Sequence, residues 1–253
     1  MSTKIIEAFS KNQKNAEGQT EGLNVSEFFC DTIQGEGRWI GYPAVFLRLQ
    51  NCTLNCIWCD TTEVWRHGDF YTMEHLFLLM EQNNVITKLE SGHHLVLTGG
   101  SPLKQQLSLI EFFIKFQNRY QFVPMAEIEN ECTLTVHPVL ADYIQCWNNS
   151  PKLSNSGNSR KARYKPHIIS QLAELSNSWF KFVVDCEEDW QEIQMDYLDL
   201  KLIKKRQIIL MPKGATRVEL EQNREMVAEM AIRHSVRYCT REHIVLWDKQ
   251  TGV

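Results

Sequence analysis

The chain has 253 residues with an apolar fraction of 43% and a charged fraction of 23%, values that are ordinary for a soluble globular protein. This length is enough for one large domain or two small ones. The formal net charge of −4 creates no overall basic field, so we expect no nucleic-acid partner. No apolar stretch approaches the length of a membrane span, and the N-terminus lacks the apolar core of a signal peptide, so no membrane association is expected. Eight cysteines without a secretory signal predict reduced thiols and a cytoplasmic location.

Residues 1–24 are predicted to be a mobile N-terminal segment, because residues 11–22 are polar and contain glycine. Residues 25–253 alternate short β-rich runs with longer amphipathic stretches, and nothing in them marks a second domain. The predicted strands are 25–30, 44–49, 94–98, 122–128, 143–147, 180–185, 207–211 and 244–247. The predicted helices are 73–83, 104–120, 167–177, 187–202 and 216–235. Such alternation indicates an α/β fold with a mostly parallel sheet and helices packed against it. The one basic run, Arg160 to Lys165, is interpreted as a solvated loop.

Cys52, Cys56 and Cys59 stand in the run NCTLNCIWCD with CxxxCxxC spacing. Three soft thiolates on one short loop suit an iron–sulfur cluster, and they leave one iron open to a small molecule. A structural zinc site is the alternative, but it usually takes four ligands, and here the fourth would come from a distant residue. The other cysteines are scattered singly and are Cys30, Cys132, Cys146, Cys186 and Cys239.

Several polar or glycine-rich motifs follow predicted strands. The cysteine loop follows strand 44–49, the turn Thr98–Pro102 follows strand 94–98, and Ser150–Lys152 lies just beyond strand 143–147. Ligands of a parallel α/β sheet collect at the C-terminal ends of its strands. The sequence therefore predicts that these motifs share one site.

Taken together, these motifs resemble those of the 7-carboxy-7-deazaguanine synthases, a family of radical S-adenosylmethionine (SAM) enzymes. The resemblance rests on IQGEG at 33–37, Arg48, the cysteine loop with Asp60-Thr61, the TGG turn, Ser150-Pro151-Lys152, and the C-terminal segments 210–212, 241–244, 246–247 and 252–253. It extends from about residue 25 to the C-terminus. It implies a single radical SAM domain with an incomplete, open β/α barrel, and a homodimer.

The resemblance also implies a reaction. The three cysteines would hold a [4Fe–4S] cluster whose fourth iron chelates the amino and carboxylate groups of SAM, and an electron from a donor such as flavodoxin would produce a 5′-deoxyadenosyl radical. The radical would abstract hydrogen from 6-carboxy-5,6,7,8-tetrahydropterin. Ring contraction with loss of ammonia would give 7-carboxy-7-deazaguanine and regenerate SAM. A magnesium ion assists in this family.

The family motifs assign roles to individual residues. The residues implied to contact SAM are Trp58, Asp60, Gly99, Gly100, Ser150, Pro151 and Lys152. The residues implied to contact the substrate are Ile33, Gln34, Gly35, Glu36, Arg48, Thr98, Pro212 and His243, and Thr61 occupies the magnesium position. At Gly99 and Gly100 we expect the lack of a Cβ to let the backbone approach SAM. Arg48 offers a fork suited to a carboxylate, although its partner could instead be Glu36 or another protein acid.

Two departures from the family pattern stand out. The family turn often has an acidic residue or Asn where this chain has Ser101. The family often has ETNGT where this chain reads Glu129-Asn130-Glu131-Cys132-Thr133, and Glu129 is a candidate for the aminopyrimidinone edge of the substrate or the SAM ribose. The alternatives are another radical SAM activity such as a glycyl-radical activase, a zinc-stabilised binding module, or a family scaffold with an added regulatory role.

Overall fold

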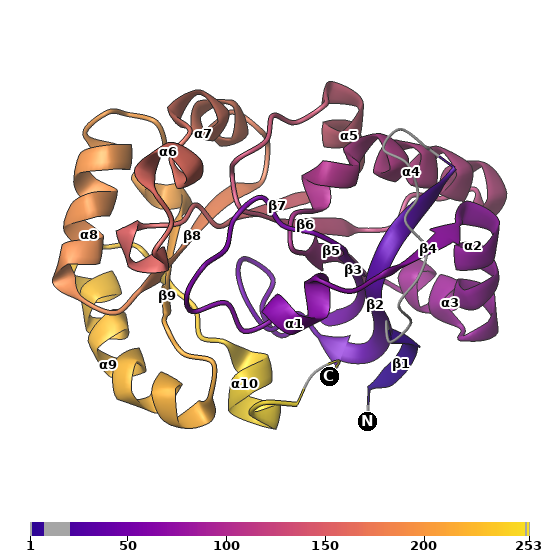
Figure 1. Cartoon of the computed structure of the whole chain (residues 1–253), viewed down its shortest axis with the longest axis horizontal. Helices are drawn as coiled ribbons and strands as arrows, with labels where there is room; N and C mark the ends of the chain where they lie inside the picture. The colour runs from indigo at the N-terminus through magenta and orange to yellow at the C-terminus, as the bar shows by residue number, and fades with distance from the viewer. Residues whose placement is uncertain (1, 8–20, 251, 253) are drawn as a thin grey trace.

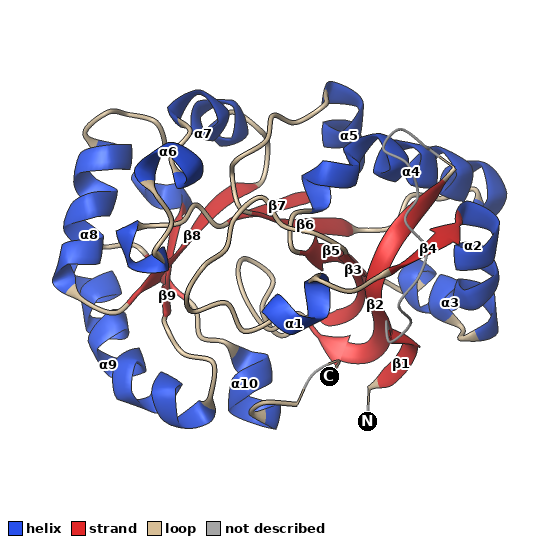
Figure 2. Ribbon diagram, in the orientation of Figure 1, coloured by secondary structure: helices blue, strands red, loops and turns tan. Residues whose placement is uncertain are grey.

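The computed structural model describes residues 2–7, 21–250 and 252, and its frame is a sheet of 10 strands in the order β1-β2-β3-β5-β6-β7-β8-β9-β10, with β4 paired to β2 (Figures 1 and 2). The strands are β1 (Thr3–Glu7), β2 (Gly22–Ile33), β3 (Pro43–Leu49), β4 (Asp69–Thr72), β5 (His94–Gly99), β6 (Ala126–Asn130), β7 (Cys146–Asn149), β8 (Ser178–Val184), β9 (Ile208–Pro212) and β10 (Arg237–Tyr238).

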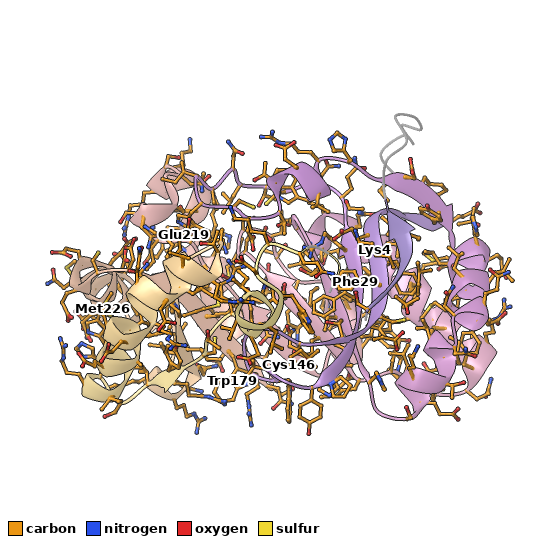
Figure 3. All side chains as sticks on the ribbon, turned by 90° about the horizontal axis from the view of Figure 1, so that it is seen from below. Lys4, Phe29, Cys146, Trp179, Glu219 and Met226 are labelled. Atoms are coloured by element: carbon orange, nitrogen blue, oxygen red, sulfur yellow. The ribbon has the colours of Figure 1, made fainter. Side chains whose placement is uncertain are left out.

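The sheet is parallel from β3 to β10, whereas β1, β2 and β4 pair antiparallel. In the first of these pairs Lys4 lies opposite Phe29, and both are labelled in Figure 3. Within the described residues β1 and β10 end the sheet without pairing to each other, so the barrel stays open. The predicted open β/α barrel with a mostly parallel sheet is therefore confirmed.

Most of the ten described α-helices cover the outside of the curved sheet, whereas α1 lies in front of it near the centre of the view (Figure 2). The helices are α1 (Thr62–Trp65), α2 (Met73–Gln82), α3 (Val85–Glu90), α4 (Gln106–Tyr120), α5 (Pro138–Tyr143), α6 (Arg160–Arg163), α7 (Pro166–Ala173), α8 (Glu187–Ile193), α9 (Arg217–Arg233) and α10 (Glu242–Trp247). Phe112 and Phe116 of α4 are buried at helical spacing and pack on Phe77 of α2, with ring centroids 5.5 and 6.1 Å apart. Among the described helices, none is both long enough and apolar enough to cross a bilayer.

The predicted strands up to 207–211 are confirmed, with shifted starts where Ala126 opens β6 and Cys146 opens β7. The predicted strand 244–247 is wrong, because these residues belong to α10. Ile244 is buried while Leu246 is 48% exposed, and β10 occupies the edge of β9 where such a strand would have paired.

Two other expectations differ from the structure. The predicted helix 187–202 is α8 followed by a π-helical turn, Gln194–Leu198. The interpretation of the basic run as a solvated loop is wrong, because α6 forms there and its Arg163 is buried in an ion pair with Glu192 at 2.6 Å.

The predicted mobile segment, residues 1–24, falls mainly on positions outside the described residues, namely 1 and 8–20. Of the described part, Thr3–Glu7 form β1, which pairs with β2.

Candidate active site

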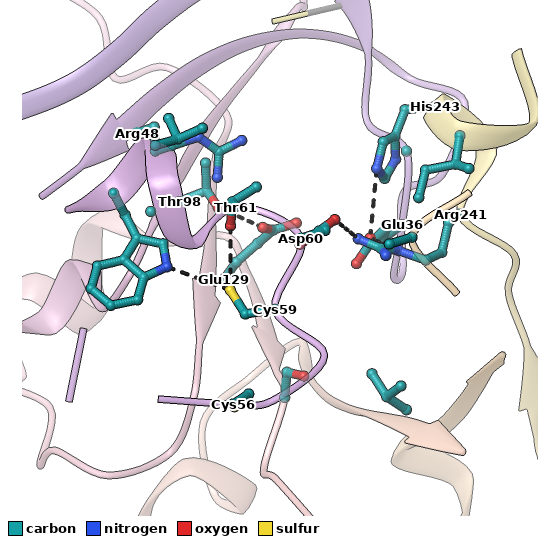
Figure 4. A pocket seen from close by; sticks show the side chains of 18 of the residues that line it. Glu36, Arg48, Cys56, Cys59, Asp60, Thr61, Thr98, Glu129, Arg241 and His243 are labelled. Atoms are coloured by element: carbon teal, nitrogen blue, oxygen red, sulfur yellow. Dashed lines mark hydrogen bonds and ion pairs between the residues drawn. The ribbon is translucent and has the colours of Figure 1, made fainter. Parts of the chain in front are cut away.

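A cavity of 520 Å³, seen from close by in Figure 4, opens at the C-terminal ends of the parallel strands. It is lined by residues of β3, β5, β6, β8 and β9 and by the segments that follow β3, β5, β6, β7 and β9. It brings together almost all the predicted site residues. Its lining includes Ile33, Gln34, Gly35, Glu36, Arg48, Cys52, Cys56, Trp58, Cys59, Asp60, Thr61, Thr98, Gly99, Gly100, Ser150, Lys152, Pro212 and His243. Of the predicted residues, all of which lie in the described part of the chain, only Pro151 is absent from the lining, and it is buried.

Hydrogen bonds from neighbouring segments hold the cysteine loop in place. The Ser101 N–H donates to the Asn51 carbonyl at 2.8 Å, and the Ile57 N–H donates to the Ser156 carbonyl at 3.0 Å. Each of the three sulfurs also receives a hydrogen bond. The donors are the Leu54 N–H to Cys52 at 3.4 Å, the Asn158 Nδ2 to Cys56 at 3.2 Å, and the Trp65 Nε1 to Cys59 at 3.4 Å. The thiols are thus presented to the cavity in a supported loop.

The three thiols differ in acidity. Burial raises the pKa of Cys52 to about 11 and also raises that of Cys56. Burial opposes ionisation of Cys59 too, but hydrogen bonds from Thr62 and Trp65 outweigh it and lower its pKa. Since metals bind the thiolate, the loop loses protons when it takes up metal.

The spacing of the sulfurs argues against a single zinc ion. Sulfurs around one tetrahedral zinc lie about 3.8 Å apart, given Zn–S bonds of about 2.3 Å. In the described part of the chain, one group of three Cys, His, Asp or Glu side chains has its ligand atoms all within 4.8 Å of one another. This group is Asp185, Cys186 and Asp189, and it does not include the loop cysteines. At least one pair of the loop sulfurs is therefore further apart, as suits a cluster that spreads its ligands over several irons.

The two glycines of the TGG turn are required by the neighbouring backbone. A Cβ on Gly99, whose φ is +139°, would lie 2.1 Å from the Leu49 carbonyl oxygen. A Cβ on Gly100 would lie 2.2 Å from the Asn51 carbonyl oxygen. This steric reason differs from the expected one, in which the glycines made room for SAM. Their contact with SAM remains a prediction.

Four charged side chains form a connected network that reaches the cysteine loop at Asp60, the residue after Cys59. Glu36 bonds to Lys181 and to Arg241, the latter with Nε–Oε1 at 2.7 Å, and Arg241 bonds to Asp60 (Figure 4). Burial alone would raise the pKa of both carboxyls, yet the cations hold the pKa of Glu36 well below its ordinary value and also lower that of Asp60. All four groups are therefore charged at neutral pH, and each charge has a partner.

The segment Gln34–Glu36 meets α10 at this network. The Glu242 N–H donates to the Gly35 carbonyl at 2.8 Å, and a Cβ on Gly35 would lie 2.1 Å from His243 Nδ1. His243 Nε2 lies 4.0 Å from Glu36 Oε1, and burial lowers the pKa of this imidazole. Gln34 is buried in the cavity wall, and within the described part of the chain its Nε2 has no hydrogen-bond partner.

Arg48 pairs with another protein acid and not with Glu36, one of the two alternatives that the sequence left open. Its Nε donates to Glu27 Oε2 at 2.8 Å across the β2–β3 pair, whereas Glu36 pairs with Lys181 and Arg241. Both Arg48 and Glu27 line the cavity.

Beyond this pair, the Thr98 hydroxyl donates to Glu129 Oε2 at 2.6 Å, so Glu129 joins the site despite the altered local sequence.

The remaining predicted residues flank the cysteine loop. Lys152 Nζ donates to the carbonyl and hydroxyl oxygens of Ser150 at 2.8 and 2.7 Å, and it lies 5.6 Å from the centre of the Trp58 ring. Thr61 precedes α1 without capping it through its side chain, and its Oγ1 lies 3.8 Å from Cys59 Sγ.

The sequence analysis did not assign a role to several charged residues of the cavity, which are Glu27, Glu131, Lys181, Lys213, Arg241, Asp248 and Lys249. Two of them had a readable signal. Glu27 in VSEFFC and Lys181 in FKFVV are charges inside strand-forming apolar runs, the same pattern that singled out Arg48.

Comparison with known proteins places this site in a class. Residues 33–126 match the model of the 4Fe-4S single cluster domain, and this range contains the three loop cysteines. The structure resembles the crystal structure of QueE from Escherichia coli, with a TM-score of 0.64 and 23% identity, covering 88% of this chain and 95% of the other, a likeness that supports the fold.

The curated relatives are more specific. The chain is 30% identical to the 7-carboxy-7-deazaguanine synthase of Pyrobaculum aerophilum, covering 92% of this chain and 98% of that protein. It is 28% identical to the enzyme of the same name from Halobacterium salinarum, covering 91% and 93%. The chain belongs to the 7-carboxy-7-deazaguanine synthase family.

Proposed function

We propose that this protein converts 6-carboxy-5,6,7,8-tetrahydropterin to 7-carboxy-7-deazaguanine with loss of ammonia, using SAM catalytically as a radical SAM lyase. The observation that carries the proposal is the convergence of three supported thiols and a set of polar and charged groups on one cavity, in a chain of this family. The alternative of a glycyl-radical activase is less well supported, because the relatives that match over most of the chain are 7-carboxy-7-deazaguanine synthases.

The donor set fits a [4Fe–4S] cluster. Cys52, Cys56 and Cys59 would hold three irons, and the cluster with SAM would supply the one-electron chemistry that starts the reaction. Trp58, Asp60, Gly99, Gly100 and the segment Ser150–Lys152 would surround SAM, with Pro151 acting by fixing the loop.

The residues assigned to the substrate would bind the carboxylate of the pterin and the amide-like edge of its ring. Arg48 keeps guanidinium nitrogens beyond the Nε that Glu27 occupies, so it would pair with the carboxylate. Gln34 Nε2 lacks a protein acceptor and would donate to a ring carbonyl or nitrogen. Glu129 would accept hydrogen bonds from the aminopyrimidinone edge, and Thr98, whose hydroxyl donates to Glu129, would hold that carboxylate in place.

His243 and Pro212 would close the wall beside Ile33, Gly35 and Glu36. Because Glu36 is already engaged by Lys181 and Arg241, its part would be to shape the cavity through its backbone and its ion pairs.

The proposal includes a magnesium ion at Thr61, whose hydroxyl is a hard oxygen donor that makes no helix cap. It also includes residues 25–253 as one radical SAM domain, a homodimer, a flavodoxin as electron donor and a cytoplasmic location. These features rest on the family resemblance, and the single continuous sheet supports the one-domain assignment.

The test is anaerobic turnover of the reconstituted protein with SAM, reductant, Mg²⁺ and the tetrahydropterin, with products identified by mass spectrometry. We expect 7-carboxy-7-deazaguanine, and a lower apparent affinity for Mg²⁺ in Thr61→Ala than in the unaltered protein. Formation of 5′-deoxyadenosine without deazaguanine would overturn the substrate assignment. A cluster-loaded sample that makes neither would overturn the catalytic assignment.

A further inference from the structure

Glu131 carries a buried carboxylate in the cavity wall. Its two oxygens differ in the hydrogen bonds that they accept. Its Oε1 accepts three hydroxyl hydrogen bonds, from Thr53 at 2.8 Å, Ser101 at 2.8 Å and Thr133 at 2.5 Å. Its Oε2 is buried and has no hydrogen-bond partner among the residues that the structure describes. A carboxylate oxygen without a donor costs free energy, so such an oxygen in a built site indicates a missing partner.

The three hydroxyls place this carboxylate next to the cysteine loop. Thr53 follows Cys52 directly, and Ser101 follows Gly100, whose Cβ position would lie 2.6 Å from the Cys52 nitrogen. Because the donors come from three different segments, they hold the side chain in one orientation. Glu131 is therefore fixed beside the position where the cluster ligands meet the TGG turn.

Lys152 supplies the opposite charge in the same cavity. Its Nζ donates to the two oxygens of Ser150 and lies over Trp58, and among the described residues no ion pair joins it to a carboxylate. Glu131 likewise forms no ion pair with any described cation. Two opposite charges that leave each other unpaired around a cavity are complementary to a zwitterion, and an α-amino acid group is the simplest such ligand.

We propose that Glu131 is the positioning residue for the methionine end of SAM, accepting from its amino group through Oε2 while Lys152 faces its carboxylate. This inference rests on the proposed function, since it takes SAM as the ligand. It also accounts for both departures from the family pattern near this site. Where the family often has an acidic residue this chain has Ser101, and the carboxylate stands instead at position 131, bonded to the Ser101 hydroxyl.

The test is the affinity of the cluster-loaded full chain for three ligands, measured by anaerobic titration calorimetry. The ligands are SAM, decarboxylated SAM, and a deamino analogue of SAM with a hydrogen atom in place of the amino group. Glu131→Gln keeps the shape but removes the charge, and we expect it to weaken SAM and decarboxylated SAM about tenfold to a hundredfold, the effect of a charge-assisted hydrogen bond. The deamino analogue has no donor for Glu131, so it should bind this variant and the unaltered protein equally.

Two further variants make the result specific. Glu127→Gln is the matched control, because Glu127 is also a buried glutamate of β6 but does not line the cavity, and its SAM affinity should not change. Combining Glu131→Ser with Ser101→Glu moves the carboxylate to the other end of the 2.8 Å hydrogen bond and should restore part of the SAM affinity. Iron content and melting temperature are measured for each variant.

The outcomes separate this inference from the proposed function. Equal losses for all three ligands in Glu131→Gln, or no loss at all, would overturn the role of Glu131 even if deazaguanine is made. Selective loss of the amino-bearing ligands would support the role even if the turnover experiment gave no deazaguanine. A cluster-loaded protein that binds no SAM would overturn both.

Discussion

Two groups of cavity residues, which adjoin at Cys59 and Asp60, differ in how their polar groups are paired. The cysteine wall, formed by Cys52, Cys56, Cys59, Glu131 and Lys152, holds thiols and charges that lack an ionic partner in the described residues. The ion-pair wall, formed by Glu36, Asp60, Lys181 and Arg241, has every charge matched. Groups left unpaired inside a protein are available to ligands, whereas a satisfied network mainly holds segments in place. The first wall is thus suited to binding and the second to architecture.

The largest loss of activity is expected when one of the three cysteines of the cysteine wall is replaced. Cys56→Ala should abolish formation of 7-carboxy-7-deazaguanine and reduce the iron content, because two thiolates do not retain the cluster stably. Iron analysis and mass spectrometry measure both. Cys186→Ala is the control, since Cys186 lies outside the cavity, and it should retain iron and activity. Full activity of Cys56→Ala would show that the loop is not the cluster site.

The ion-pair wall is expected to matter most for stability. Glu36→Gln leaves two buried cations without their shared anion, and removing one partner of a buried pair costs about 3–5 kcal/mol. The free energy of unfolding of the apoprotein, from urea titration, measures this cost. The control is Glu221→Gln, which breaks the exposed pair with Arg224 and should cost less than about 1 kcal/mol. Equal costs for the two variants would contradict an architectural role.

The same contrast explains which parts of the fold and of the site could be predicted from the sequence alone. The cysteine loop is contiguous, so its spacing predicts a cluster, and the alternation of runs predicts the parallel sheet. The ion-pair wall joins Glu36 to residues 145 and 205 positions away, and nothing in one sequence indicates which distant charges meet. Glu131 was hidden for a related reason, because its role depends on hydroxyls from three segments. The strand predicted at 244–247 failed because apolar content alone does not show that the sheet edge is already occupied.

The contribution of the ion-pair wall to the free energy of unfolding should decrease as the pH falls. The pKa of Glu36 in the folded protein lies well below its ordinary value of 4.5, because the cations outweigh burial. A lowered folded pKa gives stability that is present above the unfolded pKa and is lost as the pH falls towards the folded pKa.

The difference in unfolding free energy between the unaltered protein and Glu36→Gln should therefore be constant from pH 7 to about pH 5.5. Below about pH 4.5 it should shrink by up to about 1.4 kcal/mol per pH unit. Urea titrations across this range, on apoprotein, measure it. A difference that grows on acidification would reverse the assigned sign.

The smallest effect is expected from the hydrogen bonds that the cysteine wall receives. Trp65→Phe keeps the buried ring but removes the 3.4 Å hydrogen bond to Cys59 Sγ, and Asn158→Ala removes the 3.2 Å bond to Cys56 Sγ. Hydrogen bonds to the sulfurs stabilise the reduced, more negative cluster, so their loss should make the reduction potential more negative while iron content stays near that of the unaltered protein. A potentiometric titration followed by electron paramagnetic resonance measures this shift. Trp179→Phe, in an indole that lies outside the cavity, is the control and should leave the potential unchanged. If Trp65→Phe leaves the potential unchanged as well, the Trp65 contact serves packing, and the cysteine wall would tune its cluster through Asn158 and the backbone donor alone.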